Sequence, residues 1–211
     1  MDELPKRRVW LPSPMLLVTV GILVVLVGAI LIPGLFAANH RENEWNASST
    51  LKALVAAETD FRTNDRDGNK VKDYWTGDVS GLYYLQAPDT KIPLRLIEQD
   101  AADADAKPLF PLPKGTVAKS GYRFYALDRY ETIPGPGGEY KVDTDRSGRK
   151  VHNEKMFAFY AVPASTRVGT HQFAVNEGNC VFRELRVPPR TSWPVDSPGP
   201  GPDWFRDECC Q

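Results

Sequence analysis

The sequence contains few of the residues that most often carry chemistry. Among its 211 residues are three cysteines and three histidines, with no Cys-x-x-Cys spacing of the kind that binds zinc or performs redox reactions. The formal net charge is -1, so the chain lacks the basic surface that non-specific nucleic-acid binding requires. No phosphate-binding loop motif is present either. We therefore expect no nucleic-acid partner and no enzymatic activity, and the sequence identifies no small-molecule substrate.

One long uncharged segment lies near the N-terminus. Residues 9–39 include no Asp, Glu, Lys, Arg or His, and positions 15–38 consist mainly of Leu, Val, Ile, Gly and Ala. A helix of this length covers about 35 Å, which is enough to cross a hydrocarbon layer of about 30 Å. We expect a transmembrane helix at 15–38 that contacts the lipid bilayer. A buried core helix and a cleaved secretory signal are the alternatives, but the run is longer than a signal core of about 7–15 residues.

Charges on either side of this segment predict its orientation. Lys6, Arg7 and Arg8 precede it, whereas the residues after it are mixed in sign. An excess of positive charge keeps a flank in the cytoplasm. We therefore expect a single-pass protein of the inner (cytoplasmic) membrane, held by an uncleaved signal anchor. Its parts are a cytoplasmic segment at 1–14, the helix at 15–38, an extracytoplasmic domain at 39–187 and a tail rich in Pro and Gly at 188–211.

The extracytoplasmic part is predicted to have an α+β fold. An amphipathic helix at 43–63 places apolar residues on one face, namely Trp45, Leu51, Leu54, Val55 and Phe61. This face needs an apolar partner, and segments rich in aromatic and β-branched residues predict a small antiparallel sheet. The segments are 122–127, 156–162, 171–175 and 180–185, and the last two flank a hairpin turn at 176–179. We also expect a short helix at 94–106, an exposed loop at 134–138, and a tail attached, if at all, through Trp193, Trp204 and Phe205.

Several segments resemble those of bacterial type IV pilins and type II secretion pseudopilins. They are 32–35 (IPGL) followed by 43–63 (NEWNASSTLKALVAAETDFRT), 73–85 (DYWTGDVSGLYYL), 121–127 (GYRFYAL), 157–163 (FAFYAVP) and 172–182 (QFAVNEGNCVF). The resemblance covers most of the chain. It implies one long N-terminal helix, with a membrane half and an amphipathic half, packed on a small antiparallel sheet. It also implies a structural role in the cell envelope, with the domain in the periplasm and other pilin-like or secretion-system subunits as partners.

The chain departs from the pilin pattern at the start of the helix. Counted back from Ile32 and Pro33, the glycine cut by the pilin peptidase corresponds to Leu11, and the glutamate used in fibre assembly corresponds to Leu16. A leucine side chain cannot perform the function of the glycine or of the glutamate. The resemblance therefore supports the fold and the topology more than it supports peptidase processing or a filament.

Acidic residues cluster directly after the amphipathic helix. Asp65, Asp67, Asn69 and Asp73 surround Gly68, and closely spaced Asp and Asn oxygens on a glycine turn are ligands that Ca²⁺ accepts. A solvated turn explains the same residues, and we expect it in preference to calcium. A second pattern, from Asp143 to Glu154, matches the twelve-residue calcium loop, but strand-like residues follow it and we expect a charged hairpin loop there.

The cysteines leave two possibilities open. In an oxidising compartment, Cys180 can form a disulfide with Cys209 or Cys210, and one thiol then remains. Alternatively all three thiols are unpaired, with Cys180 acting as a small apolar residue of a strand. We expect the second arrangement.

These observations predict a membrane-anchored, non-enzymatic structural or interaction protein with a pilin-like fold. Its action depends on its helix and surface, either in a secretion or pilus-like assembly or as a solitary module. The alternative is an anchored extracytoplasmic binding or sensor domain whose acidic loop takes calcium.

Overall fold

The computed structural model describes residues 14–113, 115–132, 135–185, 192–193 and 205–209. The chain divides into two compact units, the first ending at Asn39 and the second beginning at His40. Helices occur together with antiparallel sheets, so the predicted α+β class is confirmed.

Helix α1 extends from Pro14 to Asn64 and supplies the core of the second unit. From residue 47 onward it buries one stripe of side chains, listed as Ala47, Leu51, Leu54, Val55, Ala57, Glu58 and Phe61. Most of these positions recur every three or four residues, which is the spacing of one helical face. Trp45 was predicted on this face but is 66% exposed. It lies two residues before Ala47, about 200° away around the helix, and so on the opposite side.

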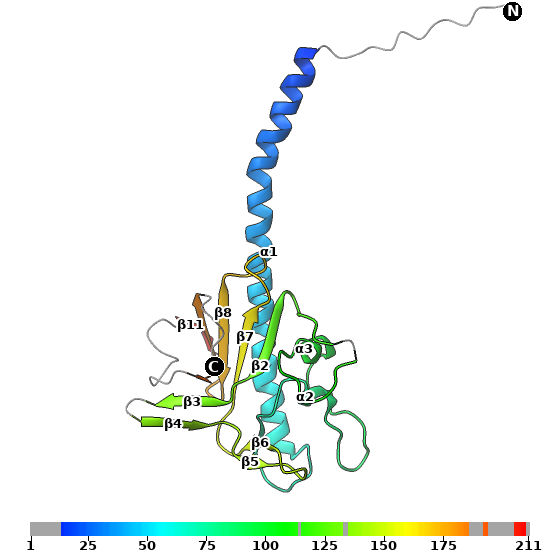
Figure 1. The fold of residues 1–211 in the computed structure, drawn as a ribbon, viewed down its shortest axis with the longest axis vertical. Helices are drawn as coiled ribbons and strands as arrows, with labels where there is room; N and C mark the ends of the chain where they lie inside the picture. The colour runs from blue at the N-terminus through cyan, green and yellow to red at the C-terminus, as the bar shows by residue number, and fades with distance from the viewer. Residues whose placement is uncertain (1–13, 114, 133–134, 186–191, 194–204, 210–211) are drawn as a thin grey trace, which may run out of the picture. The chain divides into compact units, whose positions relative to one another are not determined.

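The main sheet has five strands in the order β11-β9-β8-β7-β2, and all neighbours are antiparallel. The strands are β2 (Tyr122–Ala126), β7 (Ala158–Pro163), β8 (His171–Asn176), β9 (Cys180–Leu185) and β11 (Phe205–Cys209). Alternate side chains belong to two apolar clusters, as period two requires. Phe124, Phe159 and Phe173 share one cluster with the buried stripe of α1, beside which these strands lie in Figure 1. Tyr125, Tyr160 and Phe182 belong to the other cluster.

Two small sheets and two short helices complete the described part of this unit. One sheet has the order β1-β6-β5 and the other β10-β3-β4. The first contains β1 (Tyr74–Trp75), β5 (Asp143–Thr144) and β6 (Lys150–Asn153), and the second contains β3 (Arg129–Thr132), β4 (Gly135–Glu139) and β10 (Ser192–Trp193). The short helices are α2 (Gly81–Tyr84) and α3 (Gln99–Asp103).

Most predicted elements are confirmed, and three are corrected. The four predicted strands are β2, β7, β8 and β9, with ends shifted by at most two residues. The helix expected at 94–106 is reduced to α3, and the loop expected at 134–138 overlaps strand β4. The tail contributes β10 and β11, so it is not merely an irregular surface segment, whereas Trp204 lies outside the described residues. Backbone pairing with other strands outweighs the local Pro and Gly signals of β4, β10 and β11.

Polar contacts attach α1 to the loop between β7 and β8. The Glu44 carboxylate accepts hydrogen bonds from the backbone N–H and hydroxyl of Thr170, both at 2.9 Å, and lies 3.1 Å from the ring of His171. His40 and Asn43 each bond a backbone carbonyl of the same loop. Although burial opposes ionisation, the bonds from Thr170 and His171 hold the pKa of Glu44 below its usual value. These contacts fix the helix relative to the sheet.

A buried carboxylate organises the segment around α2. One Asp78 oxygen accepts from the indole N–H of Trp75 at 3.0 Å and from the Gly81 N–H at 2.8 Å. Its other oxygen accepts from the Ser80 hydroxyl and from the Leu109 N–H. Asp78 is 1% exposed, and both oxygens have donors, which is the condition under which a carboxylate can be buried at tolerable cost.

Asp105 is a second buried carboxyl in the same region. It accepts hydrogen bonds from the backbone N–H groups of Val79, Ser80 and Lys107, each at 2.8 Å. Burial and the nearby charge of Asp78 nevertheless raise the pKa of Asp105 to about 7. The folded state therefore binds a proton at a pH at which the unfolded chain has already lost it.

The raised pKa of Asp105 predicts a pH-dependent stability. Because the folded pKa lies above the unfolded one, this group's contribution is fully present below about pH 4 and is lost as the pH rises through about 7. Between pH 5.5 and pH 8 the contribution should fall by about 2 kcal/mol. Urea unfolding at several pH values gives the free energy of unfolding of the wild type and of Asp105→Asn. The contribution of Asp105 is the part of the pH dependence that the wild type shows and the variant lacks. Parallel pH profiles for the two proteins would contradict the assignment.

The buried stripe of α1 can be tested with two matched substitutions. Leu51 is 0% exposed, so Leu51→Asp places a carboxylate in the apolar core and should lower the free energy of unfolding by about 2 kcal/mol or more. Ala56 is exposed on the same helix, so Ala56→Asp should change stability little. Urea unfolding of the unit that begins at His40 compares the two. Equal losses would mean that the packing face is wrongly assigned.

Candidate functional site

Three side chains that can bind a metal ion converge near the end of α1. Asp67 lies in the loop between α1 and β1, Asp73 directly precedes β1, and His152 lies in β6 opposite Trp75. His152 Nε2 is 3.6 Å from Asp67 Oδ2, and His152 Nδ1 is 3.5 Å from Asp73 Oδ1. One ligand atom from each of the three residues lies within 4.8 Å of the others. Pairing of β1 with β6 brings together residues that are far apart in the sequence.

Two of these side chains are almost fully buried and have atoms without hydrogen-bond partners. Asp73 is 3% exposed and His152 is 2% exposed. Asp73 Oδ1 and His152 Nδ1 face each other, but neither makes a hydrogen bond. The second oxygen of Asp73 accepts from the side-chain amide of Asn69 at 3.1 Å. Asp73 Oδ1 and His152 Nδ1 form an ion pair with each other, but at 3.5 Å the contact is longer than a normal hydrogen bond, and buried polar atoms are usually hydrogen-bonded.

Negative charge dominates the surroundings of His152. Burial disfavours the imidazolium, but the carboxylates of Asp73 and Asp67 outweigh it and raise the pKa of His152. Burial also raises the pKa of Asp67. Glu58, on the buried stripe of α1, accepts the Trp75 N–H at 2.9 Å, and burial together with the charge of Asp73 raises its pKa well above the usual value. The group therefore favours a bound positive charge.

The structure uses the four predicted site residues in different ways. Asp67 and Asp73 join His152, whereas Asp65 accepts the backbone N–H of Lys70 and Asn69 accepts that of Val71. Asp65 and Asn69 therefore shape the turn, and Asn69 also contacts the other two residues, donating its side-chain amide to Asp73 and its backbone N–H to Asp67. Sequence reasoning missed His152, because the pairing of β1 with β6 has no local signal.

The second acidic pattern forms the predicted hairpin loop between β5 and β6. One Asp145 oxygen accepts from the Ser147 N–H, the Ser147 hydroxyl and the Arg149 N–H. The other oxygen accepts from the Arg149 guanidinium at 3.0 Å. Although desolvation opposes ionisation, these bonds hold the pKa of Asp145 far below its usual value. The carboxylate is thus occupied by its own loop.

Cys180 is disulfide-bonded, so the expectation of three unpaired thiols is wrong. The chain has only two other cysteines, so the partner is Cys209 or Cys210. The backbone register places Cys209 opposite Cys180, since β11 pairs with β9. That strand pairing was not predicted, and it brings the end of the tail to the edge of the sheet.

The disulfide is expected to stabilise the second unit substantially. Closing a loop of about 30 residues should contribute roughly 3–4 kcal/mol. Cys180→Ser should therefore lower the free energy of unfolding by about that amount, and reduction of the wild type should cause a similar loss. Urea unfolding with and without dithiothreitol measures both effects. A wild type that is insensitive to the reductant would contradict the prediction.

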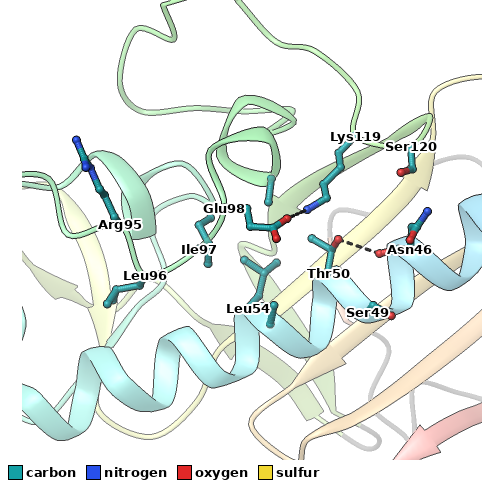
Figure 2. Close-up of a pocket in the computed structure, with 12 residues that line it drawn as sticks. Asn46, Ser49, Thr50, Leu54, Arg95, Leu96, Ile97, Glu98, Lys119 and Ser120 are labelled. Atoms are coloured by element: carbon teal, nitrogen blue, oxygen red, sulfur yellow. Dashed lines mark hydrogen bonds and ion pairs between the residues drawn. The ribbon is translucent and has the colours of Figure 1, made fainter.

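A pocket of about 580 Å³ lies between α1 and the segment that carries α3. Figure 2 shows its lining residues, with Thr50 and Leu54 of α1 on one side and Ile97, Glu98 and Lys119 on the other. Its volume falls in the range of small-molecule sites, about 300–1,000 Å³. Geometry alone does not assign it a ligand.

Lys119, one of the two cationic side chains that line this pocket, is already neutralised. Lys119 forms ion pairs with Glu98 and with Asp100, the second at 3.0 Å. Burial disfavours its ammonium, but the two carboxylates outweigh burial and raise the pKa of Lys119. The Thr50 hydroxyl likewise donates to the backbone carbonyl of Asn46 at 2.8 Å. The pocket therefore offers less for recognising a charged ligand than its size suggests.

The expected membrane segment at 15–38 receives no direct support from the structure. Within the part of the chain that is described, no helix is both long and apolar enough to cross a membrane. Many positions of the expected segment, including 28–37, have side chains outside the described set, and so do residues 1–13.

Comparisons of the chain with protein-family models, with curated proteins and with solved structures find no match. The resemblance to pilins and pseudopilins therefore stays a prediction. Function has to be inferred from the chain's own residues and geometry.

Proposed function

We propose that this protein is a membrane-anchored, non-enzymatic envelope protein of pilin-like build, with its folded second unit outside the cytoplasm. It acts through its surface, in a secretion or pilus-like assembly or as a solitary anchored module. The observation that carries the proposal is a disulfide-bonded unit that directly follows an uncharged apolar segment.

The apolar segment supports anchoring. Positions 15–38 contain no Asp, Glu, Lys or Arg. Several of its large apolar side chains are exposed, among them Met15 at 81%, Leu23 at 61% and Val25 at 70%. Apolar surface in water costs about 25 cal/mol per Å², and a lipid layer covers such surface. The segment's length suits a bilayer of about 30 Å.

The disulfide and the flanking charges support the orientation. Disulfides form and persist in oxidising compartments and are rare in the cytosol, so the bond at Cys180 favours an extracytoplasmic domain. Lys6, Arg7 and Arg8 favour a cytoplasmic N-terminus. The two inferences come from different ends of the chain and agree.

The core supports the pilin-like build. Residues of α1 between Ala47 and Phe61 share one apolar cluster with strands β2, β7 and β8 of the antiparallel sheet. Leu11 and Leu16 occupy the positions where pilins have the peptidase glycine and the assembly glutamate. This departure favours an anchor that is retained over a subunit that is cleaved and polymerised.

Membrane extraction tests the anchor and the orientation together. The full chain should resist sodium carbonate and dissolve in mild detergent, whereas a variant lacking 15–38 should not pellet with membranes. Protease added outside intact spheroplasts should digest the second unit, and Cys180 should resist alkylation until a reductant is added.

A matched control changes only the flanking charge. Replacing Lys6, Arg7 and Arg8 by glutamate should reduce the fraction that external protease reaches, without releasing the protein from membranes. Release of the wild type by carbonate, or rapid alkylation of Cys180 in unreduced cells, would overturn the proposal.

A further inference from the structure

We propose that Asp67, Asp73 and His152 form a binding site for a borderline first-row divalent metal ion of the Zn²⁺ class. The ion ties the loop after α1 to strand β6. This site is independent of membrane anchoring and adds a ligand to the proposed structural role.

The first argument is convergence. The three residues come from two separate segments, Asp67 and Asp73 from the α1–β1 loop and His152 from β6, yet one ligand atom of each lies within 4.8 Å of the others. Ligand atoms of a tetrahedral zinc ion lie roughly 3.3 Å apart, since each bond measures about 2.0–2.1 Å. The gap closes by a small inward movement of Asp67, whose side chain is 20% exposed and is the least buried of the three.

The second argument comes from buried atoms that make no hydrogen bond. Asp73 Oδ1 and His152 Nδ1 are buried, face each other at 3.5 Å and lack hydrogen-bond partners. Native structures rarely leave such atoms unsatisfied. A metal ion satisfies a carboxylate oxygen and an imidazole nitrogen together, and it offsets the negative charge of the two aspartates.

The donor set selects the class of metal. Ca²⁺ prefers six to eight oxygens, and Asp65 and Asn69, which could have supplied further oxygens, accept backbone N–H groups instead. One imidazole nitrogen with two carboxylates suits Zn²⁺ and its neighbours Co²⁺ and Ni²⁺. The site therefore differs from the calcium loop expected from the sequence, both in its ligands and in its metal.

The two ring nitrogens of His152 take different roles. They face different carboxylates, Nε2 toward Asp67 and Nδ1 toward Asp73, and one metal ion binds only one of them. The other nitrogen then carries the proton. Water completes the coordination on the side of Asp67, the more exposed ligand.

Metal titration of the full chain tests the site. The protein, without a polyhistidine tag, is purified in mild detergent and stripped with a chelator. ZnCl₂ is titrated by calorimetry, and CoCl₂ is titrated by visible absorption, which reports the coordination geometry. We expect saturation at about one equivalent and a higher thermal midpoint with Zn²⁺.

Matched variants locate the binding. Asp67→Asn and His152→Gln should each weaken Zn²⁺ binding by about 10–100-fold, whereas His40→Gln should leave it within about twofold. Circular dichroism checks that each variant folds. If His152→Gln does not fold, the Asp67→Asn variant tests the site, because Asp67 is partly exposed and its substitution disturbs the fold less.

Three results would overturn the proposal. They are no saturable Zn²⁺ binding by the wild type, unchanged affinity in Asp67→Asn, and tighter binding of CaCl₂ than of ZnCl₂. None of these results depends on where in the cell the protein lies, so a failure here is separate from a failure of the membrane proposal.

Discussion

The fold of the second unit depends on burial of one stripe of α1 against the main sheet. Leu51, Leu54 and Phe61 are each 0% exposed, and they share a cluster with aromatic residues of β2, β7 and β8. Glu58 lies in the same stripe and accepts the backbone N–H of Trp75, so the helix also positions β1. Because β1 pairs with β6, the stripe indirectly places Asp73 beside His152. The core and the candidate metal site are thus parts of one arrangement.

The sequence predicts the elements and core residues that a local residue pattern determines. Helix periodicity identified Leu51, Leu54, Val55 and Phe61 as core residues, and alternation with β-branched and aromatic residues located β2, β7, β8 and β9. Local pattern failed where pairing with another strand, near or distant in the sequence, decides the structure. The Pro and Gly residues of 134–138 indicate a loop, yet β3 supplies a partner for β4. Likewise β9 gives β11 in the tail its hydrogen bonds, and only that pairing sets Cys209 opposite Cys180.

The candidate site was half predictable for the same reason. Asp67 and Asp73 are close in the sequence, and the glycine turn between them is a local signal. His152 is joined to them by strand pairing, which single-sequence periodicity does not reveal. Asp65 and Asn69 have the same composition signal as Asp67 and Asp73, but Asp65 does not belong to the group that could hold a metal, and Asn69 donates its side-chain amide to Asp73. Residue type alone therefore cannot separate a ligand from a residue that shapes a turn.

Electrostatics links the site to the helix stripe. Glu58, Asp73 and Asp67 place three carboxyl groups in and beside the core, and their mutual repulsion and burial must be offset. Burial and Asp73 raise the pKa of Glu58, which favours a proton on that residue, and the two aspartates favour a proton on His152. Positive charge, here from protons, is therefore favoured in this cluster. A divalent ion supplies the same positive charge with directed bonds to the atoms that now lack partners, so it would hold the α1–β1 loop against β6 more firmly than protons alone.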